Sequence, residues 1–165
     1  MKVVADAMVV IHLAKITVLE KSCDYFKHLV VPPGVYDEIL AGKAKGYADA
    51  RLVEELVVAR KLVIGQITDH QLLRRGREFN IQRGELEALA LYWQEGANYL
   101  ATDDDSVRKK SVLLNVRLVG TPAILLRLYQ EKVVGKEKFL QSLEELKKIG
   151  WFSRVVIDKI SMEAA

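Results

Sequence analysis

Residues 98–105 read Asn98-Tyr99-Leu100-Ala101-Thr102-Asp103-Asp104-Asp105, a short apolar segment of β type followed directly by acidic residues. The N-terminus has the same order, because the apolar residues of 2–5 end at Asp6. Short strands of this kind alternate along the chain with longer segments of helical periodicity. This alternation predicts an α/β fold of three layers, in which helices cover both faces of a mostly parallel central sheet.

The expected elements follow from apolar periodicity and from the residues that begin and end helices. Pro32-Pro33 stops the second strand and favours the first turn of the next helix, and Thr121 is expected as an N-cap with Pro122 at the first helical position. The residues from Trp151 onward are compatible with a strand or a helix. We predict strands at 2–5, 29–31, 62–67, 98–101 and 116–119. We predict helices at 8–14, 18–26, 34–41, 46–60, 85–94, 123–130 and 136–148, with one more after Thr68-Asp69 and one from the acidic run to Leu114.

Composition limits the kind of protein. The chain has 165 residues, half of them hydrophobic, and a net charge of +3. We expect one domain over 1–165 with a sizeable core, and we exclude a disordered or collagen-like chain. The longest apolar run, Ala88–Trp93, is far too short to span a membrane, and Asp6 interrupts any signal peptide, so a cytoplasmic protein without membrane contact is expected. The single cysteine, Cys23, excludes an intramolecular disulfide and a cysteine-rich zinc site.

Five acidic residues follow predicted strands or lie in the first turns of predicted helices. The carboxyl ends of parallel strands meet at one edge of a sheet, so these side chains are expected to converge. Clustered carboxylates repel one another unless a cation neutralises them, and Mg²⁺ and Mn²⁺ prefer oxygen ligands. The cluster therefore predicts Mg²⁺ or Mn²⁺ and displacement at phosphorus. Its members are Asp6, Glu38, Glu85, Asp103 and Asp104.

Each of these acids also has a purely structural interpretation. Asp6 and the run 103–105 can cap helices, Glu85 is favoured by the helix dipole, and Glu38 can be a solvated surface residue. The three histidines, His12, His28 and His70, lack the spacing of metal ligands and are expected to be structural or exposed. The sequence contains no G-x-G-x-x-G, phosphate-binding Gly-Lys-Ser/Thr or G-x-S-x-G motif.

Four stretches of the sequence resemble a PIN domain, the fold of a family of metal-dependent nucleases. They surround Asp6, Glu38, Glu85 and the Thr102–Arg108 segment, and the stretch from Gly120 to Leu126 is similar to the toxin-related prokaryotic branch, the VapC-type ribonucleases. The resemblance implies that Asp6, Glu38, Glu85 and Asp104 are the catalytic metal ligands, with Asp103 as a neighbouring ligand and Thr102 and Asp105 in support. One position departs from the pattern: family members often carry Ser, Thr or Asn two residues after the first aspartate, and this sequence has Met8.

The resemblance gives the basic residues near the acids a role. An acidic centre repels a phosphate backbone, so surrounding cations must hold the substrate. Arg83, Arg108 and Lys109 lie within a few residues of the site acids and are the expected substrate contacts. A second basic stretch contains Arg74, Arg75 and Arg77.

We therefore expect an endoribonuclease that uses Mg²⁺ or Mn²⁺ to activate water for attack at phosphorus in single-stranded RNA, as the toxin of a toxin–antitoxin pair with a small antitoxin protein. The alternatives are a housekeeping RNA-processing nuclease, a non-catalytic PIN-like module that binds nucleic acid, and a receiver-type acidic pocket. The last needs a lysine after a later strand, and Gly120-Thr121-Pro122 provides none. The apolar content of the predicted helices 46–60 and 123–130 also predicts a homodimer.

Overall fold

A computed structural model describes residues 1–43, 48–81 and 83–165. Within these residues the strands are β1 (Lys2–Ala5), β2 (His28–Val31), β3 (Leu62–Ile64), β4 (Tyr99–Ala101) and β5 (Leu118–Val119). The helices are α1 (Ala7–Lys15), α2 (Leu19–Phe26), α3 (Pro33–Ala41), α4 (Ala48–Val58), α5 (His70–Arg77), α6 (Arg83–Glu95), α7 (Asp105–Lys109), α8 (Ser111–Leu114), α9 (Thr121–Gln130), α10 (Lys136–Ile149) and α11 (Arg154–Ala164).

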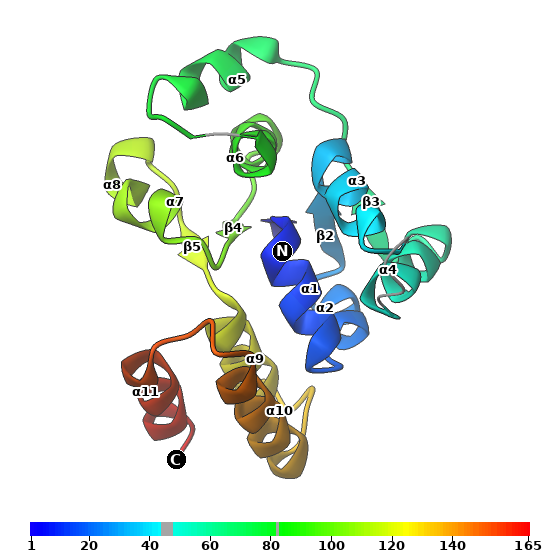
Figure 1. Ribbon diagram of the computed structural model, residues 1–165, viewed down its shortest axis with the longest axis vertical. Coiled ribbons are helices and arrows are strands. Elements are labelled where there is room, and N and C mark those ends of the chain that lie inside the picture. The colour runs from blue at the N-terminus through cyan, green and yellow to red at the C-terminus, as the bar shows by residue number, and fades with distance from the viewer. Residues whose placement is uncertain (44–47, 82) are drawn as a thin grey trace.

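The described strands form one sheet in the order β3-β2-β1-β4-β5, and every neighbouring pair is parallel. Helices lie on both sides of this sheet (Figure 1). The predicted α/β fold is thus confirmed. The chain moves from β1 to β2 on one side and later crosses to β4 on the other side of β1. The β1–β4 boundary is therefore the switch point of the sheet, where α/β proteins bind ligands at the carboxyl ends of the strands.

In β1, β2, β4 and β5, successive residues belong to two separate cores. Val3 and Ala5 of β1 belong to the larger core, with α1–α4 and α9–α11, whereas Val4 belongs to the smaller core, with α5–α8. Successive side chains of a strand point to opposite faces, so a sheet covered on both faces needs continuous apolar strands. Burial of a valine side chain such as Val3 or Val4 contributes about 1.5–3 kcal/mol to folding.

Several predicted boundaries needed correction. Gly120, and not Thr121, is the N-cap of α9, and the Thr121 side chain is used elsewhere. β3 ends at Ile64, with one further hydrogen bond from the Gly65 N–H to the Val31 backbone oxygen, and β5 begins only at Leu118. The residues after Trp151 form the helix α11. The helix predicted from Gly46 is described from Ala48 onward, and positions 46 and 47 lie outside the described residues.

The apolar helix near the C-terminus is α9, which is buried within the chain itself. Ile124, Leu125 and Leu128 are fully buried, and α10 and α11 pack against α9. This helix therefore does not need a second copy of the protein to cover it, and the predicted dimer stays a prediction. Among the described residues, no helix is long and apolar enough to cross a membrane.

Candidate functional site: an acidic pocket at the strand ends

A pocket of about 690 Å³ lies at the carboxyl ends of β1 and β4, between α3 and α6. Four of the predicted site acids line it, although they come from different parts of the chain. Asp6 follows β1, Asp104 follows β4, and the other two lie on the flanking helices. These lining acids are Asp6, Glu38, Glu85 and Asp104.

Asp6 is both a helix cap and a wall of the pocket. One carboxylate oxygen accepts the backbone N–H of Val9 at 3.0 Å, which caps α1. The side chain is buried, and this burial raises its pKa from the ordinary 3.8 to about 7. A hydrogen bond with Thr102 and the Val9 bond oppose this rise, whereas the charges of Asp103 and Glu85 add to it. The structural and functional interpretations of Asp6 are therefore compatible.

Glu85, in the first turn of α6, faces two other acids. Burial raises its pKa to about 7, and the charge of Asp104, a hydrogen bond with Asp104 and the charge of Glu38 act in the same direction. Glu38 approaches this helix closely, because a Cβ on Gly84 would lie 3.0 Å from a Glu38 carboxylate oxygen. Glycine at position 84 thus allows α3 and α6 to bring their acids together.

Asp104 caps α7, since its carboxylate accepts the Ser106 N–H at 2.7 Å. Its partial burial alone would raise its pKa, but the hydrogen bonds from Ser106, with Glu85 and Val107 contributing, outweigh burial and lower the pKa. Thr102 is buried below it and accepts the Asp104 N–H through its hydroxyl oxygen at 3.1 Å. Asp105 is exposed in the first turn of α7 and does not line the acidic pocket.

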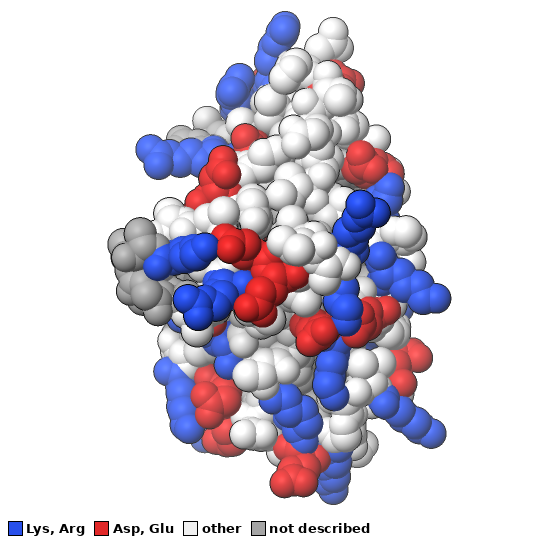
Figure 2. All heavy atoms as spheres, turned by 90° about the vertical axis from the view of Figure 1, so that its right-hand side faces the viewer, with Lys and Arg blue, Asp and Glu red and all other residues white. Residues whose placement is uncertain are grey.

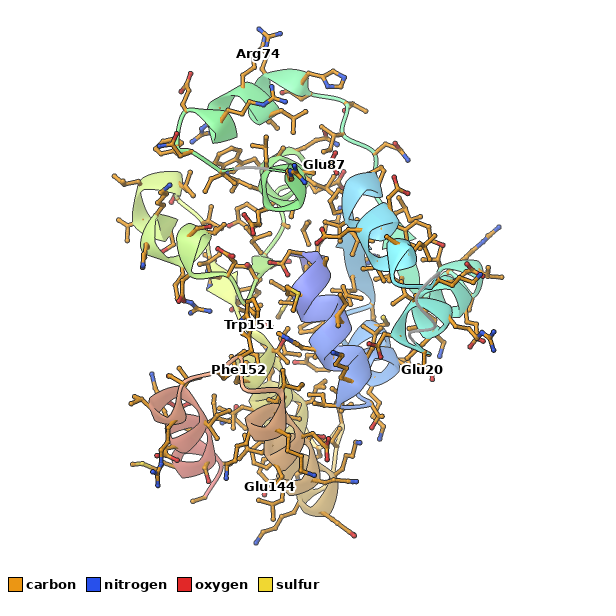
Figure 3. The ribbon with its side chains drawn as sticks, viewed as in Figure 1. Glu20, Arg74, Glu87, Glu144, Trp151 and Phe152 are labelled. Atoms are coloured by element: carbon orange, nitrogen blue, oxygen red, sulfur yellow. The ribbon has the colours of Figure 1, made fainter. Side chains whose placement is uncertain are left out.

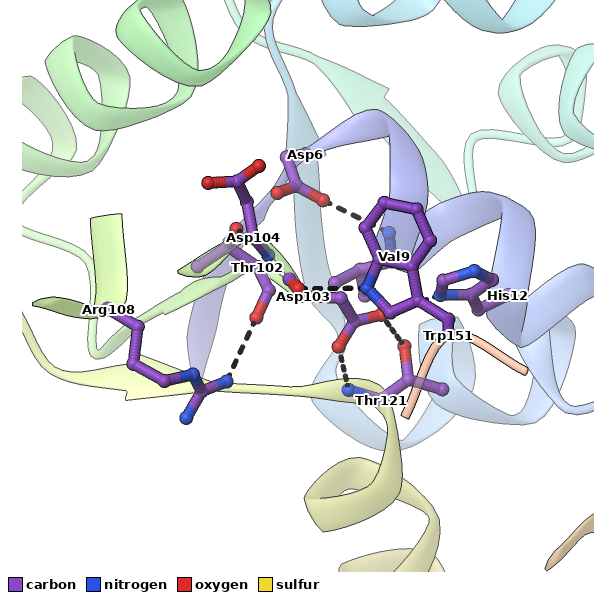
Figure 4. A network of polar contacts seen from close by, with 9 residues as sticks. All are labelled: Asp6, Val9, His12, Thr102, Asp103, Asp104, Arg108, Thr121 and Trp151. Carbon is purple, nitrogen blue, oxygen red and sulfur yellow. Dashed lines mark hydrogen bonds and ion pairs between the residues drawn. The ribbon is translucent and has the colours of Figure 1, made fainter. Parts of the chain in front are cut away.

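The structure does not bring Asp103 into the acidic pocket. One of its oxygens accepts the Thr121 N–H at 2.7 Å, and the other contacts the His12 ring at 2.8 Å and the Thr121 hydroxyl at 2.5 Å. Its backbone oxygen accepts the Trp151 indole N–H at 3.0 Å (Figure 4). Asp103 therefore joins β4 to α1, α9 and the C-terminal segment, and to ligate a metal in the pocket it would have to give up this buried network. His12 is structural, as predicted.

Two acids of the pocket, Asp37 and Glu87, were not singled out from the sequence. Glu87 lines the pocket and accepts the backbone N–H of Gly34 at 2.8 Å, in the first turn of α3 (Figure 3). A Cβ on Gly34 would collide with a Glu87 carboxylate oxygen, so a larger residue there would push the Glu87 side chain away from this position. Glu87 thus holds the helix that carries Glu38 against the helix that carries Glu85. In the sequence, Glu87 could be noticed only because it lies two residues after Glu85. That spacing does not show that Glu87 contacts the start of α3.

Replacing Glu87 should separate a positioning role from a ligand role. Glu87→Ala leaves the Gly34 N–H without its acceptor, and we expect a loss of about 1–3 kcal/mol in stability and a lower rate of catalysis. Glu87→Gln retains an acceptor oxygen and should keep most of both. Urea unfolding and cleavage rates measure the two effects. A stable Gln variant with no activity would contradict the positioning role and make Glu87 a ligand.

The predicted substrate-binding residues occupy different places. Arg83 lines the acidic pocket, Arg108 lines a neighbouring pocket, and Lys109 is exposed on α7 without lining either one. In the second basic stretch, the Arg75 guanidinium carbon lies 4.2 Å from the centroid of the Trp93 ring. This cation–π contact gives Arg75 a structural role. On the face shown in Figure 2, acidic side chains lie near the middle with basic side chains on both sides.

The donor set of the pocket suits a hard divalent cation. All donors are carboxylate oxygens, and two of them have a raised pKa because they are buried near like charges, which a bound cation would offset. As the side chains stand, no group of three His, Cys, Asp or Glu residues in the described chain is close enough to hold an ion. The residues that would hold it are Asp6, Glu38, Glu85 and Asp104, once their side chains come closer together.

Fold and pocket together define an α/β protein with carboxylates gathered at the switch point of a parallel sheet. The sequence matches the DUF3368 family of PIN domains over residues 2–164, and the chain belongs to this PIN domain family. PIN domains are generally nucleases, so the chain has a nuclease-type fold. The match confirms the resemblance to PIN domains and extends through α11, whereas the VapC-type branch stays a prediction. Neither the comparison with curated proteins nor that with solved structures gave a match.

Proposed function

We propose that this protein is an endoribonuclease that requires Mg²⁺ or Mn²⁺ and hydrolyses single-stranded RNA. The observation that carries the proposal is the convergence of Asp6, Glu38, Glu85 and Asp104 on one pocket at the strand ends. A divalent ion bound there would lower the pKa of the attacking water and would stabilise the leaving oxygen. RNA as the substrate rests on the resemblance to the VapC-type branch.

The residues that line the acidic pocket have different proposed roles, according to where they lie. Asp6 and Asp104 are fixed by the caps they form on α1 and α7, so these carboxylates are oriented before any ligand binds. Glu38 and Glu85 come from opposite walls and complete the oxygen set. Arg83, at the rim of the same pocket, is placed to hold a substrate phosphate near the acids.

The biological role that we propose is that of a toxin kept inactive by a small antitoxin protein, acting in the cytoplasm, where its RNA substrate is found. A homodimer is part of this proposal. Light scattering at tens of micromolar tests the dimer, and a small open reading frame beside the gene tests the antitoxin. A housekeeping RNA-processing nuclease would share the chemistry but lack that neighbour.

A non-catalytic nucleic-acid-binding module is the second candidate, and Met8 is the observation that favours it. Met8 lines the acidic pocket where a polar helper would assist the first aspartate. A gel assay separates the candidates, using single-stranded RNA, double-stranded RNA and single-stranded DNA with Mn²⁺, Mg²⁺ or a chelator. We expect metal-dependent cutting of single-stranded RNA, whereas binding without cutting in either metal would favour the module.

Metal binding should also stabilise the protein. An ion that binds only the folded state adds about 2.7 kcal/mol at a concentration one hundred times its Kd, so Mn²⁺ should raise the melting temperature saturably. The matched control is Glu85→Gln, which removes a proposed ligand and should reduce the shift. An unchanged melting temperature at millimolar Mn²⁺ and Mg²⁺ would contradict a divalent site in this pocket.

A further inference from the structure

A second pocket of about 950 Å³ adjoins the acidic pocket, and Asp104 lines both. Its walls come from α7, the start of α9, and the segment that leads into α11. Its lining differs from that of the acidic pocket, because aromatic and aliphatic side chains lie there beside two cations and four carboxylates. The lining includes Trp151, Phe152, Arg108 and Lys159.

Trp151 is held in one orientation and yet remains accessible. Its indole N–H donates to the Asp103 backbone oxygen at 3.0 Å, and its ring lies 5.6 Å from the His12 ring, tilted by 59°. The residue is nevertheless 49% exposed. Phe152 also packs against the His12 ring, and the centroids of these two rings are 5.2 Å apart. A fixed aromatic ring with free surface is the arrangement on which single-stranded nucleic acids stack their bases.

The cations of the second pocket suit phosphates that flank such a base. The Arg108 guanidinium donates to the Thr102 backbone oxygen at 3.5 Å, which sets it beside β4, near the acids (Figure 4). Lys159 reaches the same pocket from α11, although it also lies 3.8 Å from Glu163. The acids Asp103, Asp104, Asp105 and Glu163 line the pocket as well, so its carboxylates outnumber its cations. This mixture of charges suits one nucleotide better than a longer stretch of phosphate backbone.

We propose, on the basis of the RNA-cleaving function proposed above, that this pocket binds one nucleotide of the substrate next to the scissile phosphate. The base stacks on Trp151, and Arg108 holds an adjoining phosphate. The argument for an RNA strand as the occupant is continuity: Asp104 forms the boundary of both pockets, so a strand whose phosphate lies at the acids must continue past this wall. Stacking tolerates every base, so the pocket fixes the register of the strand more than its sequence.

The test uses short single-stranded RNAs of one sequence in which one nucleotide at a time lacks its base. Binding is measured by fluorescence anisotropy of labelled RNA, with Ca²⁺ in place of Mg²⁺ or Mn²⁺ to block cutting. For the unaltered protein, an abasic nucleotide at one position should weaken binding by about 5- to 150-fold, and other positions should have little effect. In a Trp93→Phe background, RNA should also quench the fluorescence of Trp151.

Two variants at position 151 separate stacking from structure. Trp151→Phe and Trp151→Leu both lose the hydrogen bond to Asp103, but only Phe keeps an aromatic face. We expect Leu to bind the intact RNA more weakly by the factor given above and to be insensitive to the abasic position, whereas Phe retains most of the affinity. Urea unfolding of both variants shows whether they are equally folded.

Equal binding by the Phe and Leu variants would overturn this inference. So would RNA binding by the unaltered protein that responds to no abasic position, and the pocket would then be a candidate for a partner peptide. In both cases metal-dependent RNA cleavage could still be observed, so the proposed function would stand. Failure of the unaltered protein to bind or cut any RNA would overturn the proposed function and this inference together.

Discussion

Asp6→Asn should reduce RNA cleavage by about a hundredfold or more and leave the fold intact. The amide is a neutral and poor metal ligand, so the several kcal/mol of transition-state stabilisation that a bound ion provides would be lost. Asparagine is an equally good N-cap, so the bond from the Val9 N–H can persist. Single-turnover cleavage rates and circular dichroism measure the two parts. Asp69→Asn is the matched control, because Asp69 caps α5 outside the pocket and should keep full activity.

The same variant has a predicted effect on stability that depends on pH. The pKa of Asp6 is raised in the folded protein from 3.8 to about 7, so ionisation of Asp6 opposes folding. Its protonated form favours folding fully below pH 3.8, and this contribution is lost as the pH rises toward 7. Without metal, Asp6→Asn should therefore be more stable than the unaltered protein above pH 7, by about 1–4 kcal/mol. Urea unfolding at several pH values measures this difference, which should shrink toward acid pH.

Asp103→Ala should behave in the opposite way and mainly destabilise the fold. The substitution removes the acceptor of the Thr121 N–H and hydroxyl and the partner of the buried His12 ring. Buried polar groups left without partners cost about 1–3 kcal/mol each, so we expect a total loss of about 3–5 kcal/mol. This is a large part of the stability of a typical domain.

Two control variants show whether the loss of stability in Asp103→Ala comes from the lost contacts of this side chain. Asp103→Asn keeps an acceptor for the Thr121 N–H and should cost less than Ala, and the exposed Asp105→Ala should change stability by no more than about 0.5 kcal/mol. Urea unfolding midpoints report the order. If Asp103→Ala unfolds at the same midpoint as the unaltered protein but loses its Mn²⁺-induced stabilisation, Asp103 is a metal ligand and the structural role assigned to it is wrong.

The sequence was sufficient for the layers of the fold and for most of the pocket. Apolar segments that end in acids give the strand ends, and parallel pairing then brings Asp6 and Asp104 to one edge, as predicted. Glu38 and Glu85 were expected near the same edge from their places early in predicted helices, and the family resemblance agreed with this placement. These inferences succeeded because they depend on local patterns and on a general property of parallel sheets.

The division of labour within the run of three aspartates could not be read from the sequence. Successive residues that leave an extended strand point to opposite sides, so Asp103 and Asp104 separate into different surroundings although they are chemically identical. The partners that decide between them are remote, since His12 is 91 positions from Asp103 and Trp151 is 48 positions away. Glu87 escaped notice for the same reason, because its partner Gly34 lies 53 positions away.

We propose above that Asp6, Glu38, Glu85 and Asp104 of the acidic pocket form a divalent-metal site that cuts RNA. This claim is tested most directly by incubating purified protein with a labelled single-stranded RNA, first with chelator and then with excess Mn²⁺ added back to the same sample. We predict no cutting in chelator, discrete fragments after Mn²⁺ is restored, and none at either stage with Asp6→Asn. Cutting that persists in chelator, or that the Asp6→Asn protein performs at the unaltered rate, would contradict the claim.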